Sequence, residues 1–536
     1  MKYLFERSMQ LKSPVLHLCL FLLAFLSGGL IILGLAPLSF WPASIVALLI
    51  FCFSLSLPQS TLLIKQPWLS PIGINKKLAF AFSFGLLLGG CHWVYVSMVK
   101  FGGTPIWLAV ILTAIFCGFI ASLLLPFIWL EQKLATPNVI SRSFVLAAIW
   151  VLCEWFRSWF LTGFPWLYIG YSHIDGPLAN YAPYISVYGI SFICAFTAMA
   201  VVQLTLAGRK LLAHHQTRVL ILLLGFIWLL PLKLDPLQYT ENKGDDPITV
   251  ALIQPNLDIF DKWNPEFLGS IKHYLKSVTI SNGAELTIWP ETAVPELYHR
   301  AFDELYAYSR ELKEVNQAVI LGIPSLWHSG SYSYYYNTMI GSGHAEGMYH
   351  KQKLVPFGEF IPFDEQLRGL IQFFDLPMSE FRPGPQKQTM FTIFDKYQTQ
   401  PYICYEVVYP EFVANTAGAQ DFLLTVSNDA WFGHSIGPAQ HLEIARMRAL
   451  ETGRYLIRAT NTGMTAIIGP DGKVIEQLES FKQGLLNGKV YARKGYTPVA
   501  QYGTLAPILF SFFILVFVTI LNSLAGRHKK RHSTLS

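Results

Sequence analysis

Charged residues are scarce in this sequence. Aspartate, glutamate, lysine and arginine make up 14% of its 536 residues, whereas a soluble globular protein carries about 25%. Hydrophobic residues make up 52%, and the shortage of charge is concentrated toward the two ends of the chain. The composition excludes an ordinary soluble protein and favours a membrane protein with a soluble insertion. The formal net charge of +6 is small for this length, so we expect no nucleic-acid partner.

Long apolar runs fill the regions that lack charge. A helix that crosses a membrane needs roughly 20 apolar residues, and eight runs approach that length, seven of them before the insertion. They lie at about 16–36, 39–57, 79–98, 105–130, 144–164, 186–207, 219–235 and 504–525. We therefore expect a membrane domain over 1–236 with seven transmembrane helices, an inserted domain over 237–503, and an eighth helix with a basic tail over 504–536.

Lysine and arginine are unevenly distributed between the two sides of these runs. One side receives the basic residues of the N-terminus, of three loops and of the C-terminal tail, whereas the short loops of the other side carry only Lys100. Basic loops tend to stay in the cytoplasm. The sequence therefore predicts that both termini are cytoplasmic and that the 237–503 domain lies on the opposite side of the membrane.

Cysteine is scarce in the inserted domain, which holds only Cys404. This excludes an internal disulfide there. The other six lie inside apolar runs, where a free thiol behaves as a small hydrophobe. They are Cys19, Cys52, Cys91, Cys117, Cys153 and Cys194. Domains in oxidising compartments tend to pair their cysteines, so a lone thiol outside the cytoplasm is either expendable or reactive.

The fifth apolar run contains two charges. Glu154 and Arg157 are three residues apart, which places them on one face of a helix. Charges in a membrane are expensive and normally face the bundle interior or a wet cavity. Two interpretations remain open at this point, a structural ion pair and a substrate-facing pair. The Gly-Phe-Pro-Trp loop at 163–166 comes next and is expected on the same side of the membrane as the inserted domain. We hypothesise that a lipid chain enters between this loop and the inserted domain.

Strand and helix patterns alternate in the inserted domain. Helices are expected near 266–281, 302–315 and 439–452. Short strands are expected at 248–254, 286–289, 318–323, 336–341, 346–353, 390–394, 402–404, 422–427, 455–460 and 464–468. Strands that are apolar throughout are typical of sheets covered by helices. The fold class predicted is a multi-span α-helical membrane protein with an inserted α/β domain.

Three polar residues stand at the ends of these strands: Glu291, Lys351 and Cys404. Together they suit covalent catalysis. A thiol needs a base to become a nucleophile, and a desolvated carboxylate can serve. A cation and backbone N–H groups, such as that of Tyr405, can stabilise the oxyanion. Spacing alone does not show that the three residues meet in space. From residue types alone, the alternative is that Cys404 is a buried structural thiol.

The segments around these residues resemble the nitrilase, or carbon-nitrogen hydrolase, superfamily. The blocks are WPETAVP around Glu291, YHKQKLVPFGEFIP around Lys351 and ICYEVVYPE around Cys404, in matching order and spacing. LTVSNDAWFG and HLEIARMRALETGRYLIRATNTG continue the match. With the membrane spans and the GFPW loop, the whole chain is similar to the apolipoprotein N-acyltransferase family. The resemblance implies an α-β-β-α sandwich for the inserted domain.

The resemblance also implies a role for each of the three residues. Cys404 would be the nucleophile, Glu291 the general base, and Lys351 the cation that stabilises the oxyanion. Five further residues match functional positions of the family, although each also has a purely structural interpretation. They are Glu359, Tyr405, Glu406, Trp263 and Asn337.

The reaction implied is acyl transfer at a bacterial inner membrane, with the catalytic domain in the periplasm. A fatty acyl chain would pass from the sn-1 position of a phospholipid, usually phosphatidylethanolamine, to the α-amino group of an N-terminal S-diacylglyceryl-cysteine in an apolipoprotein. A thioester on Cys404 would link the two half-reactions, with no cofactor. His434 and His441 lack further ligands at metal spacing, so we expect no metal site.

Two other functions fit parts of the pattern. A membrane-anchored nitrilase-type amidase or hydrolase would use the same three residues with water in place of the amine, but small soluble amides give it no need for eight spans. A non-catalytic lipid-binding protein on the same scaffold would not need to keep all three residue types.

Overall fold

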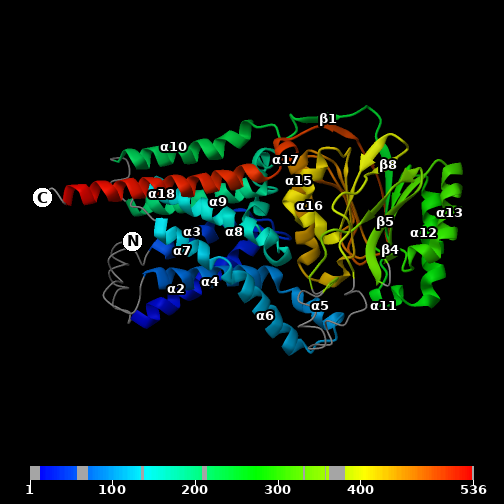
Figure 1. Cartoon of the computed structure of the whole chain (residues 1–536), viewed down its shortest axis with the longest axis horizontal. Coiled ribbons are helices and arrows are strands. Elements are labelled where there is room, and N and C mark those ends of the chain that lie inside the picture. The colour runs from blue at the N-terminus through cyan, green and yellow to red at the C-terminus, as the bar shows by residue number, and fades with distance from the viewer. Residues whose placement is uncertain are drawn as a thin grey trace.

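The computed structural model describes residues 13–56, 71–134, 138–207, 214–329, 332–356, 358–360 and 381–533. Figure 1 shows a bundle of helices at one end of the molecule and a domain of sheets and helices at the other. The bundle is built from both ends of the chain, because the last helix returns to it after the inserted domain.

Helices occupy each of the eight expected apolar runs. They are α2 (Ser13–Leu30), α3 (Pro42–Ser56), α4 (Pro71–Cys91), α5 (Val94–Lys100), α6 (Ile106–Ser122), α7 (Leu125–Leu134), α8 (Val139–Trp159), α9 (Ala182–Ala207), α10 (His215–Leu229) and α18 (Leu505–Ser533). Six stretches of the described chain are long and apolar enough to cross a membrane, and α4 with α5 forms a further pair bent by 47°. Since α3 has only 15 residues, the number of eight crossings stays a prediction.

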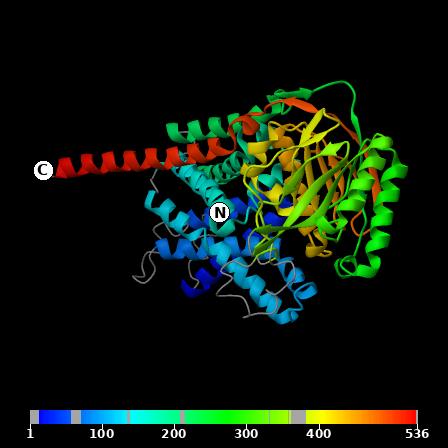
Figure 2. The same cartoon turned by 45° about the vertical axis from the view of Figure 1, so that its right-hand side comes forward.

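The last helix, α18, joins the N-terminal helices in one bundle. It packs against α8 and α9, and Figures 1 and 2 show it running away from the inserted domain beside the N-terminal helices. The chain therefore leaves the bundle after α10 and re-enters it at α18, so the inserted domain is attached at both of its ends.

Two mixed sheets form the inserted domain. The six-stranded sheet has the order β15 (Gly484–Val490), β2 (Ile248–Gln254), β3 (Leu286–Ile288), β4 (Ala318–Ser329), β5 (Tyr332–Gly343), β7 (Met348–His350). The five-stranded sheet has the order β10 (Pro401–Ile403), β11 (Leu423–Ser427), β12 (Leu456–Thr460), β13 (Ala466–Ile468), β14 (Val474–Gln477). Smaller sheets pair β1 (Thr240–Asn242) with β16 (Arg493–Gly495), and β6 (Ala345–Glu346) with β8 (Phe391–Ile393) and β9 (Tyr397–Thr399).

The two sheets pack face to face, with helices outside both. Val250 and Ile288 of one sheet share a buried core with Leu424 and Ile457 of the other. α12 (Pro265–Asn282) and α13 (Tyr298–Glu314) pack on the six-stranded sheet. α15 (Pro410–Ala417) and α16 (Gly437–Thr452) lie on the other side, and α16 also packs against α9 of the membrane bundle. The predicted α-β-β-α sandwich is confirmed.

The strand expected at 346–353 is wrong in its length. It is divided into β6 and β7 at Gly347, whose φ of +145° suits glycine, and it ends at His350. The backbone N–H groups of Gln352 and Lys353 donate to the side chain of Glu406 instead of to a neighbouring strand. Lys351 therefore lies just beyond the strand, and its buried side chain contacts Glu291 and Glu359.

Candidate active site

Cys404 lies at a sharp turn between a strand and a helix. β10 ends at Ile403, and Cys404 is the first residue of the 3-10 helix η9 (Cys404–Val408). Its φ of +52° is uncommon for a residue with a side chain, and strained backbone of this kind gathers at functional sites. The turn leaves the thiol half-buried and facing a cavity.

The buried carboxylate of Glu406 holds this turn in place. Its Oε2 accepts the backbone N–H of Ile403 at 2.7 Å. Its Oε1 accepts the N–H groups of Gln352 and Lys353 at 2.6 and 3.1 Å. One carboxylate thus fastens the turn that carries the thiol to the segment that follows Lys351. Its contacts within the described chain are structural, and it does not line the cavity.

Glu291 and Lys351 reach the same cavity from the six-stranded sheet. Lys351 Nζ lies 3.4 Å from Glu291 Oε1 and 2.8 Å from Glu359 Oε1. Asn337, on β5, donates through Nδ2 to the same two oxygens at 2.7 and 3.2 Å. One lysine and one amide therefore bind two buried carboxylates, and four residues predicted from the sequence form one cluster beside Cys404.

The pKa values of both the lysine and the thiol are raised in this cluster. Burial opposes the charge of Lys351, but Glu359 and Glu291 outweigh it, so the pKa of the lysine is raised and it remains a cation. Burial and then the Glu291 carboxylate raise the pKa of the Cys404 thiol to about 12, although Lys351 lowers it. The resting thiol is therefore protonated, and nucleophilic attack requires a base within reach.

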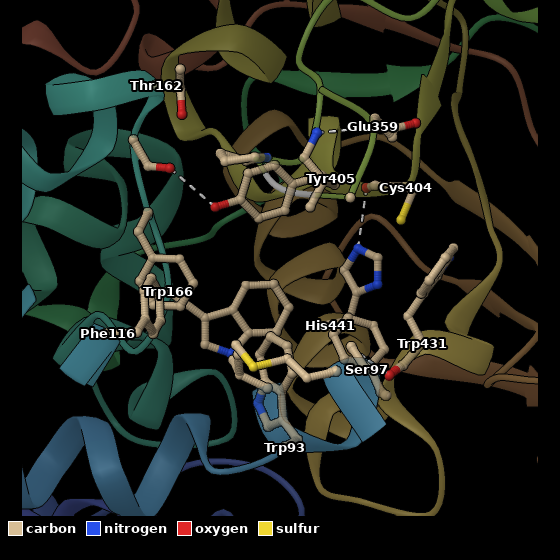
Figure 3. Close-up of a pocket in the computed structure, with 18 of the residues that line it drawn as sticks. Trp93, Ser97, Phe116, Thr162, Trp166, Glu359, Cys404, Tyr405, Trp431 and His441 are labelled. Atoms are coloured by element: carbon tan, nitrogen blue, oxygen red, sulfur yellow. Dashed lines mark hydrogen bonds between the residues drawn. The ribbon is translucent and has the colours of Figure 1, made fainter. Parts of the chain in front are cut away.

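A second buried network lies beneath Cys404. Asp429 accepts hydrogen bonds from Arg458 at 2.7 Å and from Ser427 at 2.6 Å. The ring of His441 joins this network, with Nδ1 3.1 Å from an Arg458 nitrogen and Nε2 3.2 Å from the Cys404 carbonyl oxygen, as the dashed line in Figure 3 shows. The carbonyl oxygen can only accept, so Nε2 carries a proton, while Nδ1 faces both Arg458 and, at 3.2 Å, Asp429 Oδ1. Burial and Arg458 lower the pKa of His441, so the ring is neutral.

The two histidines weighed as metal ligands have other contacts. Both nitrogens of His441 are used within this network, and the ring of His434 packs against Phe481 with centroids 3.9 Å apart. Within the described residues, no group of three or more His, Cys, Asp or Glu side chains could hold a metal ion.

A cavity of about 660 Å³ connects the cluster of Glu291, Lys351 and Cys404 with the membrane helices. Glu291, Lys351 and Cys404 line its polar part. Much of the remaining wall comes from apolar side chains of α6 and the residue after it, namely Leu112, Ile115, Phe116, Phe119, Ile120 and Leu123. A reactive polar cluster joined to an apolar chamber suits a substrate in which a hydrolysable group is attached to a hydrocarbon chain.

The outer loop of the membrane domain is bound directly to the helix that starts at Cys404. The hydroxyl of Tyr405 donates to the carbonyl oxygen of Gly163 at 3.2 Å, and that of Tyr409 donates to Thr162 at 2.8 Å. Figure 3 shows Tyr405 between this loop and Cys404. Tyr405 therefore has a contact that positions the GFPW loop over the active site, and the loop lines the cavity.

Gln440, on α16, fixes the same loop from the catalytic side. Its Oε1 accepts the indole N–H of Trp166 at 2.8 Å and that of Trp93 at 3.2 Å. The two indoles lie together with their ring centroids 5.4 Å apart. One amide oxygen of the inserted domain thus joins two tryptophans from different parts of the membrane domain, which makes the boundary between the domains a packed interface.

Glu154 and Arg157 do not form a direct salt bridge in the described structure, so the ion-pair interpretation is wrong. Glu154 Oε1 instead accepts the indole N–H of Trp150 at 2.9 Å and the backbone N–H of Ile169 at 3.0 Å. Arg157 donates to the carbonyl oxygen of Trp166 at 3.3 Å and lines the cavity. Both charged side chains therefore hold the backbone of the outer loop.

Two features of the site were missed in the sequence. Lys262 lines the cavity next to Trp263, which is 41% exposed and also lines it. The network of Asp429, His441 and Arg458 was missed as well. A lysine beside a predicted functional tryptophan, and polar residues in the block after the nucleophile, were the available signals. The roles of all these side chains stay predictions.

The two-sheet fold and this Glu–Lys–Cys cluster define a catalytic domain of the carbon-nitrogen hydrolase class. The carbon-nitrogen hydrolase family model matches residues 249–493, and a model for the apolipoprotein N-acyltransferase N-terminal domain matches residues 27–200. The chain belongs to the apolipoprotein N-acyltransferase family, and with six helices in its described residues that are long and apolar enough to cross a membrane it is a multi-pass membrane enzyme.

Relatives with that name match nearly the whole chain. The apolipoprotein N-acyltransferase of Pseudomonas syringae pv. tomato is 41% identical over 486 residues, which cover 90% of this chain and 92% of its own length. That of Coxiella burnetii is 35% identical over 506 residues, covering 92% and 99%. Among solved structures, a carbon-nitrogen hydrolase from Helicobacter pylori G27 aligns with 49% of this chain and 94% of its own, at 16% identity and a TM-score of 0.33.

Proposed function

We propose that this protein transfers a fatty acyl chain from the sn-1 position of a phospholipid, such as phosphatidylethanolamine, to the α-amino group of the S-diacylglyceryl-cysteine at the N-terminus of an apolipoprotein. The observation that carries the proposal is one cavity in which Glu291, Lys351 and Cys404 meet the apolar wall of α6. Family membership supports the same reaction.

The first half-reaction forms a thioester. Glu291 takes the proton of the Cys404 thiol as the sulfur attacks the sn-1 ester carbonyl carbon, and a C–S bond forms. Lys351 and the backbone N–H of Tyr405 stabilise the oxyanion. When the intermediate collapses, the ester C–O bond breaks and Glu291 returns its proton to the glycerol oxygen. The lysophospholipid then leaves, and the acyl chain stays on Cys404.

The second half-reaction transfers this chain to the amine. The neutral α-amino nitrogen of the acceptor attacks the thioester carbonyl, a C–N bond forms, and Glu291 takes the proton released from nitrogen. The C–S bond then breaks, the thiolate recovers the proton, and an amide is released. Because donor and acceptor occupy the same site in turn, the scheme is ping-pong.

The proposed setting is the bacterial inner membrane, with the inserted domain in the periplasm and both termini in the cytoplasm. The uneven distribution of lysine and arginine supports this orientation. Both substrates are lipid-anchored. A cavity lined jointly by α6 and the catalytic cluster lets their chains stay in apolar surroundings while the ester or amine reaches Cys404.

Transfer to a synthetic acceptor tests the proposal. Purified protein in detergent micelles is mixed with phosphatidylethanolamine that is isotopically labelled in its sn-1 chain and with a peptide that begins with S-diacylglyceryl-cysteine. The peptide should gain the mass of one labelled chain as an amide, whereas the same peptide with an acetylated N-terminus should gain nothing. Release of labelled fatty acid with no change of the peptide would instead support the hydrolase, and binding without either product would support a lipid-binding protein.

A further inference from the structure

Lys262 is a buried cation that the catalytic scheme does not use. It is the last residue of α11 (Ile259–Lys262), its side chain is only 2% exposed, and it lines the cavity next to Glu291. Its Nζ donates to the backbone carbonyl oxygen of Glu291 at 3.3 Å. An ammonium group has three donors, and this is the one side-chain hydrogen bond that Lys262 makes within the described residues.

The other two cations of the cavity wall have stronger partners. Lys351 is held by the carboxylates of Glu291 and Glu359. Arg157 lies over the ring of Tyr168 at 5.4 Å and donates to a backbone carbonyl. Lys262 alone among the three lacks both a carboxylate and an aromatic partner in the part of the chain that the structure describes.

A buried ammonium group with spare donors favours an anion from elsewhere. A buried charge is costly unless it is paired with a counterion and hydrogen-bonded. Burial lowers the pKa of Lys262 to about 8, with Glu291 acting in the opposite direction, so most of the lysine is still charged at neutral pH. The spare donors lie at the cavity that contains the reactive cluster, so an anion bound there would belong to the substrate.

We propose that Lys262 binds the phosphate diester of the donor phospholipid while its sn-1 ester is presented to Cys404. The proposal rests on the proposed function, because it takes the phospholipid as the acyl donor. In such a lipid the phosphate and the sn-1 ester are attached to the same three-carbon glycerol. A donor with its ester at the cluster of Glu291 and Cys404 therefore places a phosphate within the same part of the cavity.

This contact would allow the site to distinguish the donor from the acceptor, which are otherwise alike. The acceptor also carries a diacylglyceryl group with two esters, but it has no phosphate. Without a feature that recognises the phosphate, Cys404 would meet acceptor esters as readily as donor esters. Lys262 is thus a specificity-determining residue for the first half-reaction, and it has no role in the second.

Two donors with identical acyl chains test this. The rate at which Cys404 is acylated is followed by intact-protein mass spectrometry in mixed micelles that contain phosphatidylethanolamine or the matching diacylglycerol. The wild type should react faster with the phospholipid by about tenfold or more, the size expected for a hydrogen-bonded charge contact. Lys262→Met should lose most of this preference by slowing the phospholipid reaction alone.

A matched control and a second variant complete the test. Lys276→Met makes the same change on α12, where Glu304 keeps its contact with Lys272, and it should keep the wild-type preference. Lys262→Arg should also keep it, which makes the inference testable if Lys262→Met does not fold.

Three results would overturn the inference. They are a wild type that reacts equally with both donors, a Lys262→Met variant that keeps the preference, and a variant that slows both donors equally, which would make Lys262 a support for Glu291. A wild type that is acylated by neither donor would contradict the proposed function itself, and so the two failures are distinguishable.

Discussion

The carboxylate of Glu406 accepts the backbone N–H of Gln352 at 2.6 Å, although the two residues are 54 positions apart in the chain. The same carboxylate accepts the N–H of Ile403, immediately before the nucleophile, at 2.7 Å. These two bonds fix the turn at Cys404 relative to the segment that follows Lys351. A side chain outside the cavity thus fixes how Cys404 lies relative to Lys351.

Replacing Glu406 with glutamine should damage both activity and stability. The amide has one acceptor oxygen, and its NH₂ group would face a backbone N–H, so at least one buried donor loses its partner at a cost of about 1–3 kcal/mol. We expect acyl transfer to fall by about a hundredfold, since small displacements of reacting groups have effects of that size. Initial rates and melting temperatures check this, with Glu314→Gln on the exposed side of α13 as control. A Glu406→Gln protein with wild-type rate and stability would refute the account of this contact.

Lys351 and Lys353 offer a matched pair two residues apart. Lys351 lies between two carboxylates and lines the cavity. Lys353 lies over the ring of Tyr409 at 5.3 Å and does not line the cavity. Lys351→Met should slow thioester formation by about 10²–10³-fold, the effect of removing one oxyanion-stabilising donor. Lys353→Met should keep most of the rate. Single-turnover acylation measures both, and equal losses in the two variants would contradict the assignment.

Removing the charge of Glu291 should change two reactivities of Cys404 in opposite directions. Glu291→Gln takes away the general base, so acylation by phospholipid should fall by about 10²–10⁴-fold. Burial, the larger cause of the raised thiol pKa, remains, but the carboxylate's contribution is lost, so the pKa should move down and more thiolate should be present at a given pH. Alkylation of Cys404 by iodoacetamide at pH 8, followed by peptide mapping, should therefore be faster than in the wild type. Slower alkylation would mean that Glu291 does not raise the thiol pKa.

Glu154→Gln tests whether a buried membrane carboxylate is needed for the chemistry. Trp150 and Ile169 both donate to one oxygen of Glu154, and an amide oxygen can accept the same two bonds. Acylation of Cys404 by a soluble activated ester should therefore stay close to the wild-type rate. A complete loss of this reaction would show that the negative charge of Glu154, and not only its hydrogen bonding, is required.

The residues of the candidate site were predictable because their signal is local. Glu291 and Cys404 each end or follow a short apolar strand, and polar residues in such places stand out in the sequence. The only local signal for Lys262 was its place beside Trp263, because its hydrogen bond joins α11 to the loop after β3. The end of β7 was likewise set by Glu406, far along the chain.

Local spacing was misleading where tertiary partners compete. Glu154 and Arg157 have the spacing of a helical ion pair, yet Ile169 and Trp166 of the outer loop are their hydrogen-bond partners. Backbone groups of an irregular loop near a membrane must be satisfied by some side chain, and no sequence pattern shows in advance which one will do so.

Intact-protein mass spectrometry after mixing the protein with phosphatidylethanolamine, without an acceptor, tests the central claim most directly. The wild type should gain the mass of one acyl chain, and a peptide amine bearing S-diacylglyceryl-cysteine should remove it. Cys404→Ala should remain folded and gain nothing, and Cys404→Ser should react far more slowly, because a carboxylate is a poor base for a hydroxyl. An acyl adduct of equal size on Cys404→Ala, or full transfer by that variant, would contradict the thioester mechanism.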